Sequence, residues 1–257
     1  MNSNFTNSRG RARIGVVVPV TNTNLEPDMN MLRPPGVSVH FTRSGGYDID
    51  AIPDEKQMQN YSDSAWEETV DQLVHCRSDI ILYGCTSATL AQGPAFDEDF
   101  RQRIEQRTSI PTITAASSLI EALSDLGIKK FALTSPYVAS LNDYAVSFIE
   151  AYGMTCVGRL DTPTPLSNNA VAALTPKQIF EMAMEVNSDE AEAIVLSCTD
   201  IRAVEAIEAI EDKLQKPVIT SNQAMMHASL KRLGIGHHES PIRDHQLAQK
   251  YLNGAKL

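Results

Sequence analysis

Two cysteines lie at matching places in the two halves of the chain, where a pair of thiols could do chemistry. Cys85 lies in the stretch IILYGCTS and Cys198 in the stretch IVLSCTD, so each follows an apolar run and one small residue. Thiols on opposite sides of one cleft can divide the work, one acting as a base or nucleophile and the other supplying a proton. The pair therefore indicates chemistry at a single carbon or double bond, with no metal and no organic cofactor.

The residues after each cysteine predict how the thiols would ionise. A helix N-terminus lowers the thiol pKa from its free value of ~8.5 by favouring the thiolate. Because Thr86 and Thr199 are expected to begin helices, both thiols should ionise readily. Free cysteines also often just fill a core. That structural interpretation is favoured for Cys76, inside an amphipathic helix, and for Cys156, but the duplicated context disfavours it for the pair.

The same two turns could also hold a ligand through backbone N–H groups. The groups of Thr86 and Ser87, and those of Thr199 and Asp200, could form two small anion cradles. A ligand held between two such cradles would most naturally carry two carboxylates. Small polar residues after a strand are also ordinary helix caps, and the two interpretations are compatible.

Composition excludes several classes of partner. The chain of 257 residues has a formal net charge of −10 and a pI near 5.1, which argues against nucleic acid and anionic membranes. Its apolar runs fall well short of the ~20 residues that span a bilayer, and its opening residues are no signal peptide. Four cysteines without a CxxC motif, and without histidines at zinc-ligand spacing, predict free thiols, no metal site and a cytoplasmic protein.

The elements that carry the cysteines recur along the chain. A strand over 14–19 and another over 131–136 each end in proline, and the segment PTIT at 111–114 corresponds to PVIT at 217–220. The offsets between equivalent positions are 117 residues for the first pair, 113 for the cysteines and 106 for the last pair. The sequence therefore predicts a duplicated unit of ~110 residues, the usual size of one domain.

Strands that alternate with helices predict the fold class. We expect helices over about 64–77 and 97–107, one ending at Gly127, one starting at Thr175-Pro176, and one that follows Cys198 directly. This order predicts an α/β protein of two pseudo-symmetric, doubly wound parallel-sheet domains of Rossmann or flavodoxin type. The active site would lie in the cleft between them, at the carboxyl ends of the strands. The expected domains are 1–117 with 222–257, whose helix crosses back, and 118–221.

Four motifs carry a resemblance to a known family. They are VPVTNTNLE at 18–26, SPY at 135–137, SNNAVA at 167–172 and CTDIR at 198–202. Over residues 14–235 the chain resembles the cofactor-independent aspartate/glutamate racemase superfamily, in its branch of maleate cis-trans isomerases and arylmalonate decarboxylases. There the last motif often reads CTNLR. The resemblance implies that Asn22 and Asn168 bind substrate and that the phenol of Tyr137 contacts it. From sequence alone, Asn22 could instead shape a turn and Asn168 could cap a loop. Tyr137 could instead be a rim or core aromatic. Arg202 and His227 are expected to be structural.

Several reactions fit this resemblance. In a cis-trans isomerase, the thiolate of Cys85 adds to the double bond of maleate, Cys198 protonates the neighbouring carbon, and rotation and elimination give fumarate. In a two-thiol amino-acid racemase, one cysteine removes the α-proton and the other returns one. A decarboxylase is disfavoured, because it typically lacks the first cysteine. A small-ligand binding protein without turnover is the alternative from another class. The resemblance also implies a homodimer or homotetramer, and the GGYD segment at 45–48 departs from the isomerases at a possible lid.

Overall fold

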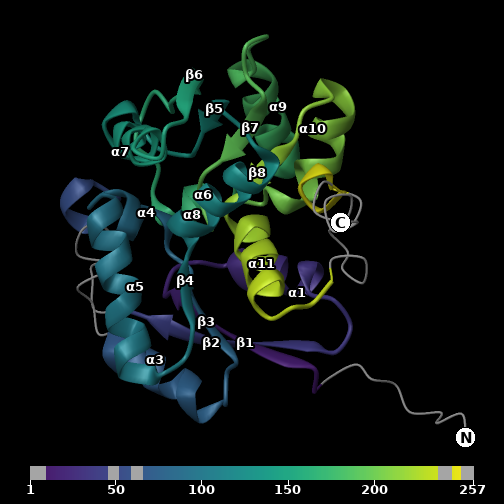
Figure 1. The fold of residues 1–257 in the computed structure, drawn as a ribbon. Coiled ribbons are helices and arrows are strands. Elements are labelled where there is room, and N and C mark those ends of the chain that lie inside the picture. The colour runs from purple at the N-terminus through teal and green to yellow at the C-terminus, as the bar shows by residue number, and fades with distance from the viewer. Residues whose placement is uncertain (1–9, 46–51, 59–65, 237–244, 250–257) are drawn as a thin grey trace, which may run out of the picture.

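A computed structural model describes residues 10–45, 52–58, 66–236 and 245–249. They form two four-stranded parallel sheets (Figure 1), ordered β2-β1-β3-β4 and β6-β5-β7-β8. The first sheet consists of β1 (Ala12–Pro19), β2 (Val37–Ser44), β3 (Ile80–Tyr83) and β4 (Thr112–Thr114). The second consists of β5 (Lys130–Thr134), β6 (Thr155–Leu160), β7 (Ala193–Leu196) and β8 (Val218–Thr220). The identical strand order confirms the predicted α/β fold of two pseudo-symmetric doubly wound sheets.

The central strands owe their positions to continuous apolar sequence. Every residue of β3 and β7 is buried, as expected of parallel strands that are covered on both faces. In the first sheet Val16 pairs in register with Leu82, and in the second Leu133 pairs with Val195. Both cysteines therefore follow buried strands in the interior of a sheet.

Helices connect the strands on both sides of each sheet. In the first half they are α1 (Leu25–Leu32), α3 (Trp66–His75), α4 (Thr86–Leu90), α5 (Pro94–Thr108) and α6 (Ala115–Leu126). In the second half they are α7 (Ala139–Glu150), α8 (Asn168–Ala172), α9 (Pro176–Val186), the 3₁₀ turn η1 (Val204–Ala206), α10 (Ile207–Leu214) and α11 (Ser221–Arg232). The predicted helix start at Thr175 is confirmed, because Thr175 forms a capping box that begins α9, and Gly127 ends α6 with a φ of 70°.

The structure differs from the sequence-based expectation after the second cysteine. No helix begins at Thr199; the chain turns over residues 199–203 and becomes helical only at η1 and α10. The prediction of a matching helix there was therefore wrong, although α4 does begin at Thr86. The sequence analysis also missed β2, β6 and α7. The expected helix start at Ser64 and most of the possible lid lie outside the described residues.

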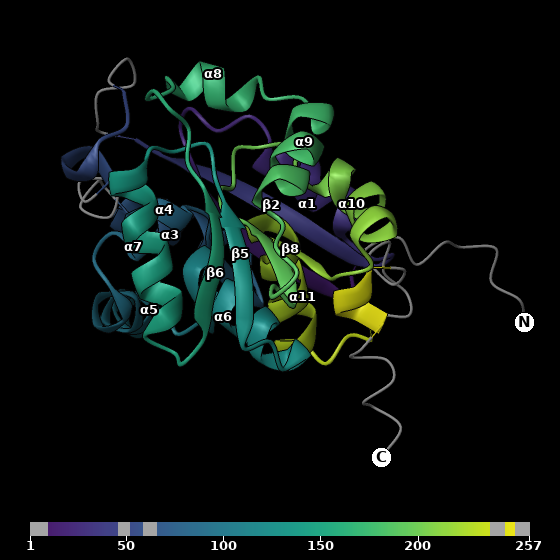
Figure 2. The same ribbon diagram turned by 90° about the horizontal axis from the view of Figure 1, so that it is seen from above.

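Helices α6 and α11 lie between the two sheets, and each packs into the core of the half to which it does not belong by sequence (Figures 1 and 2). Each contacts both β4 and β8, and the two helices pack against each other. Although α6 follows the last strand of the first sheet, Leu119 and Leu123 belong to the core of the second. Conversely, α11 follows the last strand of the second sheet, but Met225 and Leu230 complete the core of the first. Each core thus includes a helix that follows the other sheet along the chain.

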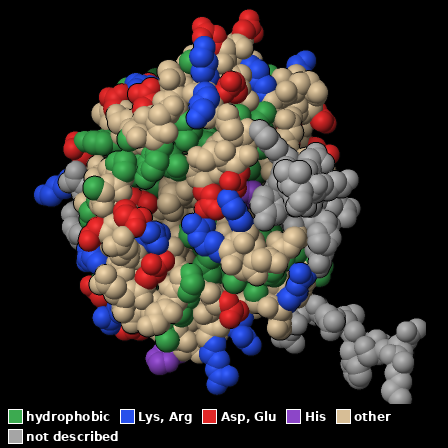
Figure 3. All heavy atoms as spheres, in the orientation of Figure 1, with side chains coloured by type: hydrophobic (Ala, Val, Ile, Leu, Met, Phe, Trp, Pro, Cys, Tyr) green, Lys and Arg blue, Asp and Glu red, His purple; other side chains and the backbone are tan. Residues whose placement is uncertain are grey.

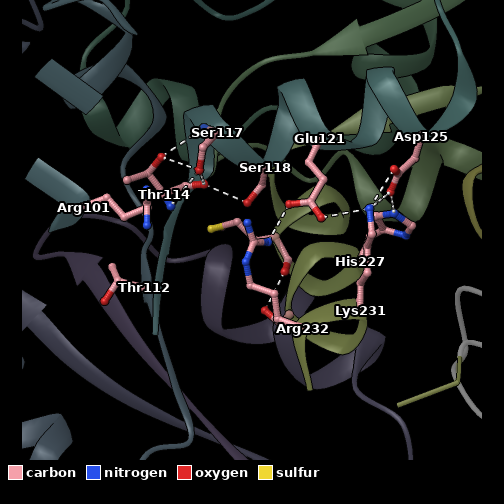
Figure 4. Close-up of polar contacts among 12 residues, drawn as sticks. Arg101, Thr112, Thr114, Ser117, Ser118, Glu121, Asp125, His227, Lys231 and Arg232 are labelled. Atoms are coloured by element: carbon pink, nitrogen blue, oxygen red, sulfur yellow. Dashed lines mark hydrogen bonds and ion pairs between the residues drawn. The ribbon is translucent and has the colours of Figure 1, made fainter. Parts of the chain in front are cut away.

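A row of polar and charged side chains joins these two helices (Figure 4). His227 of α11 is fully buried and its Nε2 lies 2.9 Å from a carboxylate oxygen of Asp125 on α6. Lys231 lies 2.8 Å from the same carboxylate and 3.2 Å from that of Glu121, which also pairs with Arg232. His227 is thus a packed residue, as expected, and the row fixes how α11 sits along α6.

The surface carries mixed charge. Lys and Arg side chains are interspersed with Asp and Glu over the face that Figure 3 shows. In the described part of the chain, no helix has the length and apolar character needed to cross a membrane.

Candidate active site

A cavity of about 430 Å³, including its open mouth, lies where the carboxyl ends of the two sheets meet. All nine residues singled out from the sequence line it, and they come from five separate segments of the chain. These residues are Asn22, Cys85, Thr86, Ser87, Tyr137, Asn168, Cys198, Thr199 and Asp200. Pro19, Thr21 and Val171 complete the lining. The structure therefore brings the two cysteine turns and the three predicted substrate-binding residues together around one space.

Cys85 is surrounded by hydrogen-bond donors. It is the N-cap residue of α4, and its Sγ lies 3.7 Å from Oγ of Ser87. Burial raises the pKa of the Cys85 thiol, whereas the N–H of Ala88 and the hydroxyl and N–H of Ser87 lower it. The expected lowering by the helix start is therefore present, but loss of hydration outweighs it because only 6% of Cys85 is exposed.

Cys198 has a different environment. Burial, followed by the nearby Asp200 carboxylate, raises the pKa of its thiol to about 12. The Tyr137 hydroxyl, 3.6 Å from Sγ, and the N–H of Asp200, 3.4 Å away, oppose that rise. The prediction of a lowered pKa was wrong here, because the turn supplies a carboxylate instead of a helix N-terminus. At neutral pH Cys198 is a protonated thiol, which suits a proton donor.

Asn22 links the first half of the cavity to the second. Its Oδ1 accepts the N–H groups of Asn24 and Leu25 at 3.0 and 2.9 Å, which fixes the turn into α1. Its Nδ2 donates to Oγ1 of Thr199 at 3.0 Å, and that hydroxyl donates to the carbonyl of Gly84 at 3.0 Å. Asn22 therefore both shapes a turn and lines the cavity.

Asp200 fastens the second cysteine turn to the first half. Its Oδ1 accepts the N–H of Thr23 at 2.9 Å, and the N–H and side-chain amide of Asn24, each at 3.2 Å. Burial raises the pKa of Asp200 to about 6, against the effect of these donors. Asp200 is therefore mostly ionised at pH 8, although only 8% of the residue is exposed.

The start of α11 supports both cysteine turns and was missed in the sequence. Ser221 accepts a hydrogen bond from the Thr86 hydroxyl at 3.0 Å. The next residue, Asn222, donates through Nδ2 to the carbonyl of Thr199 at 3.1 Å and to the carboxyl of Asp28 at 2.7 Å. Burial raises the pKa of Asp28 to about 7. The only sequence signal was the capping residue Thr220, which marks a helix start but not its partners.

Arg43 of β2, also missed, holds the turn that carries Asn22. Its guanidinium donates to the Asn22 carbonyl at 2.8 Å and to the Val20 carbonyl at 3.2 Å, and it pairs with Glu26. By contrast, Arg202 pairs with Glu205 through two 2.8 Å hydrogen bonds, as expected of a structural residue. Within the described residues, no three His, Cys, Asp or Glu side chains are grouped so as to hold a metal ion.

This arrangement can present a planar substrate to two unequal thiols. Cys85 lies among groups that stabilise a thiolate, while Cys198 lies beside the Asp200 carboxylate, which favours the neutral thiol. The backbone N–H groups and the Ser87 hydroxyl at the first turn can hold a carboxylate. The site can therefore add a sulfur to one carbon and deliver a proton to its neighbour.

Comparison with known proteins places the chain among relatives of known activity. A family model described as arylmalonate decarboxylase matches residues 14–242. The chain is 28% identical over 236 residues to the maleate isomerase of Geobacillus stearothermophilus, covering 87% of this chain and 92% of that protein. It shares its fold with two solved structures. One is a maleate isomerase variant from Pseudomonas putida S16 with maleate, with a TM-score of 0.84 at 23% identity over 92% of this chain and 97% of that one. The other is a Nocardia farcinica maleate cis-trans isomerase variant with a covalently bound succinylcysteine intermediate, with a TM-score of 0.82 at 21% identity over 93% and 98% of the two chains.

Proposed function

The chain belongs to the arylmalonate decarboxylase family, and from this premise we propose that it is a cofactor-independent cis-trans isomerase of a small dicarboxylate, of the maleate-to-fumarate type. The observation that carries the proposal is the unequal pair of thiols, Cys85 and Cys198, in one cavity. The similarity to maleate isomerases supports the same substrate class. A decarboxylase that needs a single proton donor would have no use for the second thiol.

Each step of the reaction has a residue in place. The thiolate of Cys85 forms a bond to one alkene carbon, and the electron pair of the double bond takes the proton of the Cys198 thiol at the other carbon. Rotation about the new single bond brings the carboxylates to opposite sides. Cys198, now a thiolate, removes the proton from that carbon, and Cys85 leaves as a thiolate. Atoms and charge balance, because the proton and the electron pair return to their starting places.

The surrounding residues have separate tasks in this scheme. The N–H group of Thr86 and the hydroxyl of Ser87 hold one carboxylate beside Cys85, and the turn at Thr199 faces the other end of the substrate. Tyr137 hydrogen-bonds the Cys198 thiolate while it is charged. Asn22 and Asn168 contact the substrate from the cavity wall.

The decisive experiment follows maleate by proton NMR in D₂O with the purified protein and, separately, follows aspartate and hydantoins. We expect fumarate from maleate and no exchange of the α-proton of aspartate. Cys85→Ser and Cys198→Ser should each abolish turnover, and Cys156→Ser, which changes a half-buried cysteine outside the cavity, should retain it. If maleate and its half-amide both persist unchanged at high protein concentration, the isomerase proposal is wrong, and α-proton exchange with loss of chirality would establish a racemase.

We also propose the setting in which the protein acts. Its four free cysteines fit a reducing cytoplasm. Helix α11 packs in the first core and α6 in the second, which supports one domain of residues 1–117 with 222–257 and another of residues 118–221. Assembly as a homodimer or homotetramer is tested by light scattering of the purified protein.

A further inference from the structure

The two cysteine turns are equivalent by sequence but differ at one position that lines the cavity. The offset of 113 residues that relates the cysteines also relates Thr86 to Thr199 and Ser87 to Asp200. One end of the cavity therefore has a neutral hydroxyl, whereas the corresponding place at the other end has a carboxyl group. A substrate with two identical carboxylates would meet two different ends.

The structural task of Asp200 does not require a charge. All of its side-chain hydrogen bonds to the described residues go through Oδ1, which accepts from Thr23 and Asn24. An asparagine could accept the same hydrogen bonds through its single amide oxygen. What the aspartate adds is negative charge and a second acceptor, Oδ2, which receives no hydrogen bond from the described part of the chain.

The charge of Asp200 is partly offset by the hydrogen bonds on Oδ1 and by Arg43, but by no cation among the described residues that line the cavity. The titratable groups around it are Cys198, Asp28 and, behind the turn of Asn22, Arg43. Among the described residues that line the cavity there is no Lys, Arg or His. An ionised Asp200 therefore repels a second carboxylate placed beside it and attracts an N–H donor.

We propose that Asp200 selects an unsymmetrical substrate, with a carboxylate at the Cys85 end and a hydrogen-bond donor, an amide or ammonium N–H group, at the Cys198 end. The half-amide of a cis-unsaturated dicarboxylate is the simplest such molecule. An amino-substituted acid has the same donor chemistry. The inference rests on the proposed isomerase function, and it replaces one of the two carboxylates of the proposed substrate with a nitrogen-bearing group.

Binding of saturated analogues tests the inference without requiring turnover. Calorimetry at pH 8 compares succinate, succinamate and β-alanine, which present a carboxylate, an amide and an ammonium at the second end. We expect the wild-type protein to bind succinamate or β-alanine at least about 10-fold more tightly than succinate, the order of effect of a hydrogen bond to a charged group. In Asp200→Asn this preference should vanish. It should also fade in the wild-type protein as the pH falls below 6, because Asp200 then takes up a proton.

The control and the turnover assay separate the two proposals. Asp28→Asn removes a buried carboxyl group that does not line the cavity, and it should keep the preference. Equal binding of all three ligands, or a preference that survives in Asp200→Asn, would overturn the role of Asp200. If maleamate and maleate are both left unchanged while the binding preference holds, the isomerase function is wrong and the inference on ligand class stands. The tighter of the amide and ammonium ligands identifies the donor.

Discussion

Replacing Gly84 with alanine tests whether the place of Cys85 is set by backbone packing. Gly84 lies between the end of β3 and Cys85, and its N–H donates to the Val17 carbonyl at 2.9 Å. A Cβ added to Gly84 would lie 2.7 Å from that carbonyl oxygen and 2.4 Å from Cδ2 of Leu25, which is fully buried. Ordinary contact begins at 3.4 Å, so the two backbones must separate by about 0.7 Å.

The expected cost follows from this displacement. Overpacking of a dense core costs about 1–3 kcal/mol of the free energy of unfolding. Because the shifted residue adjoins Cys85, the sulfur moves as well, and a displacement approaching 1 Å lowers kcat/KM by up to roughly 100-fold. Urea denaturation measures the first effect, and the rate of fumarate formation measures the second.

Gly158 supplies a matched control in the second sheet. A Cβ there would lie 2.7 Å from the Val186 carbonyl oxygen and 3.2 Å from Cβ of Ala132, and none of these residues lines the cavity. Gly158→Ala should lose similar stability and keep the kcat/KM of the wild-type protein. If Gly84→Ala retains full activity, or if both variants lose activity equally, then backbone packing does not set the position of Cys85.

Three further substitutions test the network behind the cavity. Asp28→Asn should raise the free energy of unfolding above pH 7 by on the order of 1 kcal/mol, because an ionised carboxyl must otherwise be buried. The folded pKa of about 7 exceeds the unfolded value, so this gain should grow as the pH rises from about 4 to 7; denaturation at several pH values checks it, and a pH-independent gain would contradict the cause. Tyr137→Phe should lower kcat/KM roughly 10-fold and move the pKa of Cys198 further upward, since the phenol hydrogen bond is lost. The rate at which iodoacetamide labels Cys198 in a background without the other cysteines follows its thiolate fraction, and faster labelling in Tyr137→Phe would refute the contact. Asn222→Ala should destabilise the fold by about 2 kcal/mol and lower kcat more than it raises KM, because the Thr199 turn loses its donor. Ser229→Ala, a buried change in the same helix, is its control, and equal kinetic losses in both variants would argue against a positioning role.

The sequence predicted the parts of the fold that local chemistry determines. Apolar runs ending in Cys85 and Cys198 mark buried central strands, and Thr175 marks a helix start through its capping box. Only three of the eight residues of the missed strand β2 are buried, because it lies at the edge of its sheet, so it lacks a continuous apolar run. The same holds for β6.

The contacts behind the site could not be predicted in this way. The hydrogen bond between Thr86 and Ser221 joins residues 135 positions apart, and that between Asn222 and Asp28 spans 194 positions. Nothing local in the sequence records such partners. The thiol pKa values were mispredicted for a related reason, because burial is a property of the whole fold and here outweighs the nearby N–H groups.

The packing of α6 and α11 in each other's half of the molecule has a consequence for biosynthesis. A ribosome releases the chain from its N-terminus, and domains generally fold as they emerge. The first sheet is complete once β4 has emerged, but its core stays open until Met225, Met226 and Leu230 follow. A nascent chain paused before Ser221 therefore exposes apolar surface that only later residues cover. Between the emergence of β4 and that of α11, the protein therefore depends on rapid chain elongation or on a chaperone to protect this surface from aggregation.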